Sequence, residues 1–411
     1  MNKQNPLKVG IVGIGARGFN ILGMLLKMED VEILAVCEKR EDHLEKARQA
    51  VAECKKQDSP TLFTTDYRDM LKIDEIQAVF NTASWADHTQ IVIEAMEAGK
   101  DVAFEVGGAH SIRECWNLVE AQQRTGRKCM MLENCCYGRM ELAALSMARK
   151  GLFGEIVHCT GGYGHDQRGA ISCMVENGRY RLPNYIHRNG DNYPTHALGP
   201  IAKILDINRG NRMVSLVSVA SKAVGVADYI QRNCDADHPL QGQKFRQGDV
   251  ISTIITCAHG ETIALTLDTG IPRPYSRHFG IFGTKGLYDE DGRCFYFTEG
   301  SVEAELKECL GNEDSYFEEH DHPIWVEKRN QPLKPGEAHG GMDALVLQAF
   351  VDSVRFDLPT PIDVYDAAAW MCITTLSEES VSMGGAPVAI PDFTNGRWIT
   401  NKFEQNNKWS I

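Results

Sequence analysis

Residues 7–28 read "LKVGIVGIGARGFNILGMLLKM", and this stretch decides the fold of the first part of the chain. It begins with a short apolar run rich in β-branched residues, which is typical of a buried strand. Gly13, Gly15 and Gly18 follow with the spacing GxGxxG, and the apolar positions of residues 19–28 fit a helix. The stretch therefore predicts a strand, a tight glycine turn and a helix.

The alternation of strand and helix continues to about residue 135. Further strand-like runs occupy residues 31–38, 76–83, 101–106 and 128–135, with helical patterns between them. This alternation predicts a parallel, doubly wound sheet of the α/β class, covered by helices on both faces. From about residue 137 the pattern changes to strands spaced by turns, which predicts an α+β domain with a largely antiparallel sheet.

The glycine motif gains a specific meaning from Glu38, at the end of the second predicted strand and about 20 residues after Gly18. The glycines permit a tight turn and a close approach of a pyrophosphate to the helix N-terminus, where free N–H groups favour anions. Glu38 can accept hydrogen bonds from ribose hydroxyls, and it repels a 2′-phosphate. The motif therefore predicts NAD binding, while Lys39 and Arg40 keep NADP open as an alternative.

The composition is that of a globular protein, with 43% hydrophobic and 24% charged residues among 411. A net charge of −13 argues against nucleic acid and anionic membrane surfaces as partners. No uncharged apolar run reaches about 18 residues, so no transmembrane helix is expected. The first ten residues lack an apolar signal core, which favours the cytoplasm, although export after removal of a leader is compatible with the sequence. The 13 cysteines include no CxxC and are expected to be reduced thiols, with Cys135 and Cys136 buried.

Four stretches carry a resemblance to a known superfamily. They are "VGIVGIGARG" (9–18), "NTASWADHTQIVIEAMEAGKDVAFEV" (81–106), "YPTHALGPIAKILD" (193–206) and "FGIFGTKGLYDED" (279–291). The chain resembles, over nearly its whole length, the oxidoreductases grouped with glucose–fructose oxidoreductase and inositol dehydrogenase. The resemblance implies an NAD-binding Rossmann domain at residues 1–136. It also implies a substrate-binding α+β domain at 137–411, with an open-faced sheet and with last helices that pack back on the first domain.

Two departures from that superfamily concern its usual proton-transfer groups. Dehydrogenases of the superfamily usually carry Glu-Lys-Pro after the fifth strand, whereas this chain has Glu105, Val106 and Gly107. An aspartate usually stands four residues before the histidine, and here Asn192 takes that place before His196. A dehydrogenase built in this way would lack its lysine and its aspartate.

These departures are similar to those of glycoside hydrolase family 109, the NAD-dependent α-N-acetylgalactosaminidases. Its marks are "MLENCCYGR" (131–139), the Glu-Val pair at 105–106 and "YPTHALGP" (193–200). The resemblance and the glycine motif together imply cofactor contacts from Gly13, Gly15, Ala16, Arg17, Gly18, Glu38, Trp85, His88, Glu105, Val106 and Asn134. The resemblance implies contacts with a small glycoside from Tyr163, Arg181, Tyr193, His196 and Tyr275, with Arg179 as an alternative to Arg181.

The resemblance also implies a chemistry different from that of ordinary two-carboxylate glycosidases. The sugar is oxidised at C3 by hydride transfer to NAD, the C2 proton is removed and the C1 group is eliminated. Water then adds, and the hydride returns to C3. Tyr193 and His196 would present both side chains on one side of the backbone if a helix begins there, and they are the expected proton carriers. Tyr137 is expected to support them, and a plain helix start with a buried histidine is the structural alternative.

Two other functions remain open from the sequence. One is an NAD(P)-dependent sugar or polyol dehydrogenase, and the other is a non-catalytic regulatory protein that binds NAD. The polar stretch at residues 309–323 is expected to be a surface loop. No metal is expected, because His320, Asp321 and His322 read as solvated side chains on this loop. His339 is a further candidate near the site, and a homo-oligomer is expected because exposed sheet faces in the superfamily form interfaces.

Overall fold

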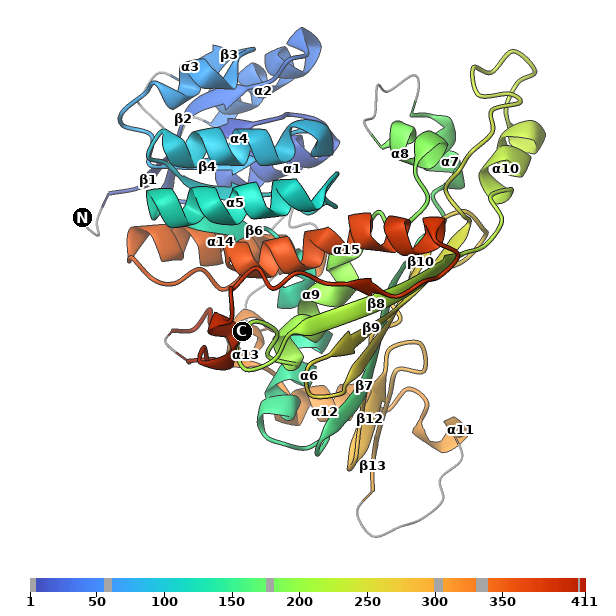
Figure 1. The fold of residues 1–411 in the computed structure, drawn as a ribbon. Helices are drawn as coiled ribbons and strands as arrows, with labels where there is room; N and C mark the ends of the chain where they lie inside the picture. The colour runs from blue at the N-terminus through green and yellow to red at the C-terminus, as the bar shows by residue number, and fades with distance from the viewer. Residues whose placement is uncertain (1–4, 55–60, 175–180, 299–305, 330–338, 406) are drawn as a thin grey trace.

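The fold is described from a computed structural model, which covers residues 5–54, 61–174, 181–298, 306–329, 339–405 and 407–411. Two sheets dominate it, and helices separate them (Figure 1). No helix within the described ranges is long and apolar enough to cross a membrane.

The first sheet is parallel and has the strand order β3-β2-β1-β4-β5-β6. Its strands are β1 (Leu7–Val12), β2 (Val31–Cys37), β3 (Leu62–Thr64), β4 (Ala78–Asn81), β5 (Asp101–Phe104) and β6 (Cys129–Met131). The chain reverses its direction of winding between β1 and β4. In open α/β sheets, ligands bind at such a switch, outside the carboxyl ends of the strands. The predicted doubly wound sheet is confirmed.

Helices connect these strands in the expected alternation. They are α1 (Ala16–Leu25), α2 (Glu41–Cys54), α3 (Tyr67–Leu71), α4 (Trp85–Glu97) and α5 (Ile112–Thr125). The sequence marks both ends of α5. The hydroxyl of Ser111 accepts a hydrogen bond from the Glu114 N–H, and Gly126 ends the helix at φ 65°, in the left-handed region.

The second sheet has eight strands in the order β13-β12-β11-β7-β10-β9-β8-β14. Only the β7–β10 pair is parallel, which confirms the largely antiparallel prediction. The strands are β7 (Ile156–Gly164), β8 (Met213–Ala220), β9 (Val250–Cys257), β10 (Thr262–Asp268), β11 (Gly280–Gly283), β12 (Gly286–Asp289), β13 (Cys294–Phe297) and β14 (Val388–Ala389). Buried and exposed residues alternate along β9, so one face of the sheet is covered and the other is open.

The remaining helices all follow β6 in the chain. They are η1 (Asn134–Tyr137), α6 (Arg139–Arg149), α7 (Arg168–Ser172), α8 (Leu182–His187), α9 (Thr195–Ile204), α10 (Gly225–Asn233), α11 (Leu306–Cys309), α12 (Glu313–His320), α13 (Pro323–Arg329), η2 (His339–Gly341), α14 (Met342–Arg355), α15 (Val364–Ser382) and η3 (Arg397–Ile399). α15 lies between α5 and β8, and α14 packs against β1 and η1 (Figure 1). One hydrophobic core therefore runs through both sheets.

The predicted surface loop around residues 309–323 is wrong. This polar stretch contains α12, whose Phe317 is buried against the core. Both Asp321 and His322 are buried rather than solvated, and the Asp321 carboxylate pairs with Arg139 at 2.8 Å. The polar composition of the stretch gave no indication of the buried Phe317 ring or of the ion pair between Asp321 and Arg139, which attach the segment to the rest of the fold.

Candidate functional site

The glycine loop between β1 and α1 has the close packing that its spacing predicts. Gly13 has φ 89°, which side chains rarely adopt, and a Cβ there would lie 2.6 Å from the backbone nitrogen of Ala83. A Cβ on Gly18 would lie 1.9 Å from the carbonyl oxygen of Gly13. Only glycine fits at these two positions, because backbone crowds both.

The opening of α1 fits an anionic ligand. Gly15 is the N-cap, no side chain caps the helix, and a Cβ on Gly15 would meet nothing within 4 Å. Glu38 lies next to this loop, since its carboxylate accepts hydrogen bonds from the N–H groups of Ile14 at 2.5 Å and Arg40 at 2.8 Å. An uncapped helix start beside open space and a carboxylate is suited to a dinucleotide with its pyrophosphate on α1 and its ribose near Glu38.

A buried carboxylate, Asp343, ties this loop to the second half of the chain. The guanidinium of Arg17, on α1, pairs with Asp343 at 2.7 and 2.9 Å and with Glu105 at 2.9 Å. The amide of Asn134 and the Nδ1 atom of His339 also contact Asp343, at 2.7 and 2.8 Å. Two of the predicted cofactor residues, Arg17 and Asn134, thus meet His339 at one side chain in the first turn of α14, and Glu105 joins them through Arg17.

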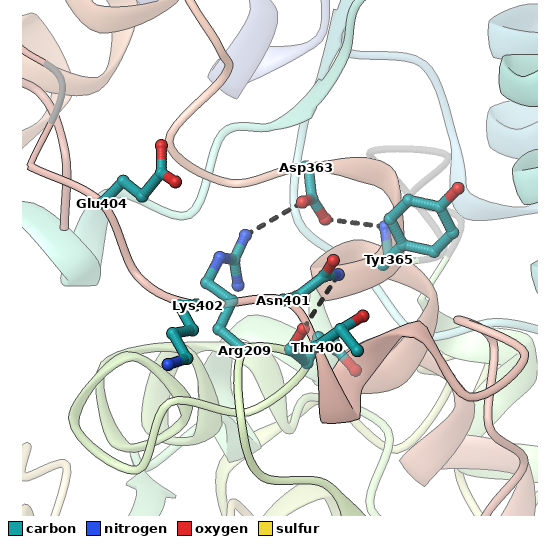
Figure 2. Close-up of a pocket in the computed structure, with 8 residues that line it drawn as sticks. Arg209, Asp363, Tyr365, Thr400, Asn401, Lys402 and Glu404 are labelled. Carbon is teal, nitrogen blue, oxygen red and sulfur yellow. Dashed lines mark hydrogen bonds and ion pairs between the residues drawn. The ribbon is translucent and has the colours of Figure 1, made fainter.

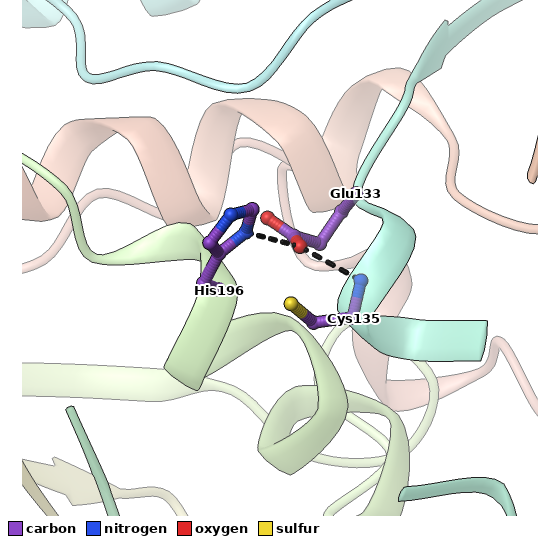
Figure 3. A group of neighbouring side chains, drawn as sticks. All are labelled: Glu133, Cys135 and His196. Atoms are coloured by element: carbon purple, nitrogen blue, oxygen red, sulfur yellow. Dashed lines mark hydrogen bonds and ion pairs between the residues drawn. The ribbon is translucent and has the colours of Figure 1, made fainter. Parts of the chain in front are cut away.

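The predicted pair Tyr193 and His196 is part of a row of three contacting side chains, Tyr193, His196 and Glu133, which we call the proton chain. Tyr193 lies two residues before α9 and His196 lies in its first turn, and the phenol oxygen is 3.4 Å from Nε2 of the imidazole. Nδ1 of His196 is 2.6 Å from Oε1 of Glu133, a fully buried residue that precedes η1 (Figure 3). Because Nδ1 faces the carboxylate, Nε2 is the nitrogen left to exchange a proton with Tyr193.

Charge stabilises this arrangement. Burial alone would raise the pKa of Glu133, but the adjacent His196 holds it below its usual range. Burial would likewise lower the pKa of His196, yet the neighbouring Cys135 and Glu133 raise it above its usual range. Since burial raises the pKa of the Cys135 thiol, that thiol is neutral at pH 7, and the charge that favours a protonated His196 is the Glu133 carboxylate.

Aromatic rings form a wall around the proton chain. The Tyr193 ring packs against Trp85 and Tyr163, with centroids 5.8 and 4.5 Å apart. The Arg181 guanidinium lies 4.8 Å from the Trp85 ring centre and 4.7 Å from that of Tyr193. Tyr275, which is 53% exposed, meets Tyr163 edge-on at 6.2 Å. Rings with a few fixed polar groups are typical of small-molecule pockets, and every predicted substrate residue belongs to this wall.

The Trp85 indole also joins the wall to the end of β5. Its Nε1 donates to the carbonyl oxygen of Val106 at 3.0 Å, and a Cβ on Gly107 would clash with the indole. The Val106 side chain is buried and apolar, so this position offers no ammonium group to the site.

Two predicted residues have their contacts elsewhere. The His88 ring packs edge-on against Phe104, and its Nε2 lies 3.3 Å from the carbonyl oxygen of Asn81. Burial lowers the pKa of His88 to about 4. The Tyr137 ring packs against Trp409, and its hydroxyl has no hydrogen-bond partner in the described part of the chain. The roles of both stay predictions, and Arg179 lies outside the described residues.

Sequence reasoning missed three residues that the geometry brings into the site. Glu133 holds His196, Asp343 gathers the cofactor side, and the Cys135 thiol lies beside His196. A weak signal existed for the first two. Glu133 is a carboxylate that directly follows an apolar strand, and Asp343 opens a helix after two glycines.

A separate pocket of about 330 Å³ lies near the C-terminus (Figure 2). Its lining residues are Asn208, Arg209, Asp363, Tyr365, Thr400, Asn401, Lys402 and Glu404. Arg209 is paired there with Asp363 at 2.9 Å and also with Asp366. The pocket contains none of the predicted site residues, and its half-buried guanidinium, Arg209, is already paired with carboxylates.

Comparison with protein families divides the chain into two matches. Residues 7–133 match the oxidoreductase family with an NAD-binding Rossmann fold. Residues 137–400 match the C-terminal domain of glycosyl hydrolase 109. Among solved structures, levoglucosan dehydrogenase in complex with NADH is similar, with a TM-score of 0.69, 17% identity and coverage of 94% of this chain and 100% of that one. Myo-inositol 2-dehydrogenase from Lactobacillus plantarum has a TM-score of 0.67, also at 17% identity, covering 94% of this chain and all of that one. At such identities these two structures support the fold alone.

Two proteins compared by sequence are more similar to this chain than the two solved structures are. An α-N-acetylgalactosaminidase from Tannerella forsythia is 38% identical over 96% of this chain and 87% of its own length. A glycosyl hydrolase family 109 protein from Solibacter usitatus (strain Ellin6076) is 36% identical over 97% of this chain and 91% of its own length. The family match extends over more than half of the chain, and these relatives span nearly all of it. The chain therefore belongs to glycosyl hydrolase family 109 and is an enzyme with an NAD-binding Rossmann fold.

Proposed function

We propose that this enzyme hydrolyses α-N-acetylgalactosaminides while keeping one NAD bound and returning it unchanged. The observation that carries the proposal is the chain from Tyr193 through His196 to Glu133 beside an aromatic wall. The name of the Tannerella forsythia relative supports the substrate class.

When bound, NAD would accept a hydride from C3 of the sugar and later return it. Gly13, Gly15, Ala16 and Gly18 would hold its pyrophosphate, and Glu38 would hold its ribose, which favours NAD over NADP. Arg17 and Asn134 would border it through their shared contact with Asp343, and Glu105 through its contact with Arg17.

The chain's own residues would move the protons. Glu133 fixes Nδ1 of His196, so that Nε2 exchanges a proton and Tyr193 passes it to or from the sugar. The positively charged imidazole and Arg181, which lies over the Tyr193 ring, would face the oxygen atoms of the bound sugar. Negative charge develops on these oxygen atoms once the C3 position is a ketone. Trp85, Tyr163 and Tyr275 would orient the sugar ring against these groups.

The buried valine at position 106 argues against the competing dehydrogenase. Its side chain cannot donate a proton, and its carbonyl group is engaged by Trp85. The proposal includes a cofactor-binding half at residues 1–136 and a sugar-binding half at 137–411. It also includes assembly of a homo-oligomer through the open sheet face.

The test follows p-nitrophenol release from the p-nitrophenyl α-N-acetylgalactosaminide together with NADH absorbance. We expect release without NADH accumulation and without added cofactor. In D₂O the sugar product should carry deuterium at C2, because the abstracted proton exchanges with solvent. Stoichiometric NADH would instead indicate a dehydrogenase, and release without deuterium at C2 would refute the elimination route.

A further inference from the structure

We propose that the side chains of Glu133, Cys135 and His196 form a binding site for a thiophilic divalent cation, of which Zn²⁺ is the representative, and that its occupation inhibits the enzyme. One ligand atom from each of the three residues lies within 4.8 Å of the other two (Figure 3). Carboxylate, thiolate and imidazole are the three ligand types that zinc uses in proteins. The inhibition rests on the proposed function, whereas the binding does not.

The geometry needs only a small adjustment to hold a cation. Zinc takes such ligands at about 2.0–2.3 Å, which places tetrahedral ligand atoms about 3.5 Å apart. Glu133 and Cys135 are two residues apart at the start of η1, and His196 is fixed in the first turn of α9. Oε1 of Glu133 and Nδ1 of His196, 2.6 Å apart, would separate by about 1 Å, and ligand atoms up to 4.8 Å apart would close by about 1 Å. Both changes are within the reach of side-chain rotation.

Two further contacts favour occupation. Oε2 of Glu133 is buried and has no hydrogen-bond partner among the described residues, so it is a second oxygen available to a cation. Without a cation the buried thiol is neutral, but the Arg277 guanidinium lies 3.5 Å from Sγ of Cys135 and would stabilise the thiolate that forms when a cation displaces the thiol proton. Three protein ligands leave a fourth position for water, and the side chain of His196 is 14% exposed, which provides an entry path.

Occupation would interrupt the proton chain. The cation takes over the Glu133 oxygen and one imidazole nitrogen, and the thiol proton and the displaced imidazole proton pass to solvent. His196 can then no longer exchange a proton with Tyr193. Hard cations such as Mg²⁺ prefer oxygen ligands and should not have this effect.

The binding test uses the NAD-containing enzyme and Co²⁺, whose thiolate charge-transfer absorbance reports a cysteine ligand directly. We expect saturable binding of one Co²⁺, displaced by Zn²⁺. Cys135→Ser should abolish the charge-transfer band and weaken Co²⁺ binding tenfold or more. Even groups that only contact a metal ligand typically change affinity roughly 10–100-fold when they are replaced. Glu133→Gln should also weaken binding. Cys173→Ser removes an exposed thiol and is the matched control, with binding equal to that of the wild type.

The inhibition test compares hydrolysis with Zn²⁺ and with Mg²⁺. Zn²⁺ should inhibit the wild type and Cys173→Ser equally, and inhibition of Cys135→Ser should require a tenfold higher Zn²⁺ concentration. No saturable Co²⁺ band in the wild type, or an unchanged band in Cys135→Ser, would overturn the site. If no glycoside is hydrolysed, the proposed function fails while the Co²⁺ spectra still decide the binding. A normal Co²⁺ spectrum without inhibition by Zn²⁺ would overturn the inhibitory role.

Discussion

Replacing Glu133 with glutamine tests whether this buried carboxylate governs the proton chain. The substitution keeps the shape of the side chain and removes its charge. Oε1 of Glu133 is 2.6 Å from Nδ1 of His196 and is fully buried, so the hydrogen bond is charge-assisted and desolvated. A bond of this kind contributes about 1.5–3 kcal/mol, against about 1 kcal/mol for a neutral one. The difference of about 0.5–2 kcal/mol corresponds to roughly a 2–30-fold loss in rate.

The tautomer of His196 adds to this loss. After His196 gives up its Nε2 proton, Glu133 keeps the remaining proton on Nδ1. A glutamine amide can instead donate to Nδ1, and the remaining proton then resides on Nε2, which faces Tyr193 and can no longer accept a proton. The corresponding change in the serine-protease triad costs about 10⁴-fold. We therefore expect kcat to fall by about 100-fold or more, with KM and NAD content little changed.

The assay is p-nitrophenol release, with NAD content and the thermal midpoint measured on the same samples. Glu313→Gln is the matched control, because Glu313 is also a buried carboxylate but pairs with Tyr288 and Arg293, away from the proton chain. If Glu133→Gln kept kcat within about threefold of the wild type while the control behaved normally, the carboxylate would not govern His196.

Three further predictions concern Tyr193, Glu38 and the buried Asp191, which lies two residues before Tyr193. Tyr193→Phe should lower kcat by about 100-fold with NAD retained, since it removes a proton carrier; an unchanged kcat would exclude Tyr193 from the chain. Glu38→Ala should weaken NAD binding more than NADP binding in equilibrium titrations, because the carboxylate that repels a 2′-phosphate is gone; equal losses would place Glu38 away from the ribose. Burial raises the pKa of Asp191 to about 7, so the folded state retains a proton that the unfolded state loses near pH 4. The stability that this retained proton contributes is full below about pH 4 and is lost as pH rises toward 7. Asp191→Asn should therefore raise the thermal midpoint more at pH 8 than at pH 5. An equal shift at both pH values would refute this.

Local signals predicted the nucleotide half well. The strand, glycine turn and helix at residues 7–28 depend on neighbours in sequence, and so does the helix start that brings Tyr193 and His196 together. Residue periodicity and cap residues report such short-range structure directly.

Contacts between distant segments could not be predicted in this way. Glu133 meets His196 across 63 positions, and Asp343 meets Arg17 across 326. Nothing local to either carboxylate indicates its partner. The pattern around Tyr137 likewise gave its position near the end of β6 but not the direction of its ring, which packs against Trp409.

The contact between Arg17 and Asp343 also restricts how such a protein can be recombined. A nucleotide-binding half is often regarded as a module that evolution or an engineer can graft onto a new catalytic half. Here the graft would bring a guanidinium and the amide of Asn134 without the carboxylate that both contact. The start of α14 therefore has to be inherited with the glycine loop, so a functional chimaera would need its crossover points chosen by spatial contact and not by the order of the sequence.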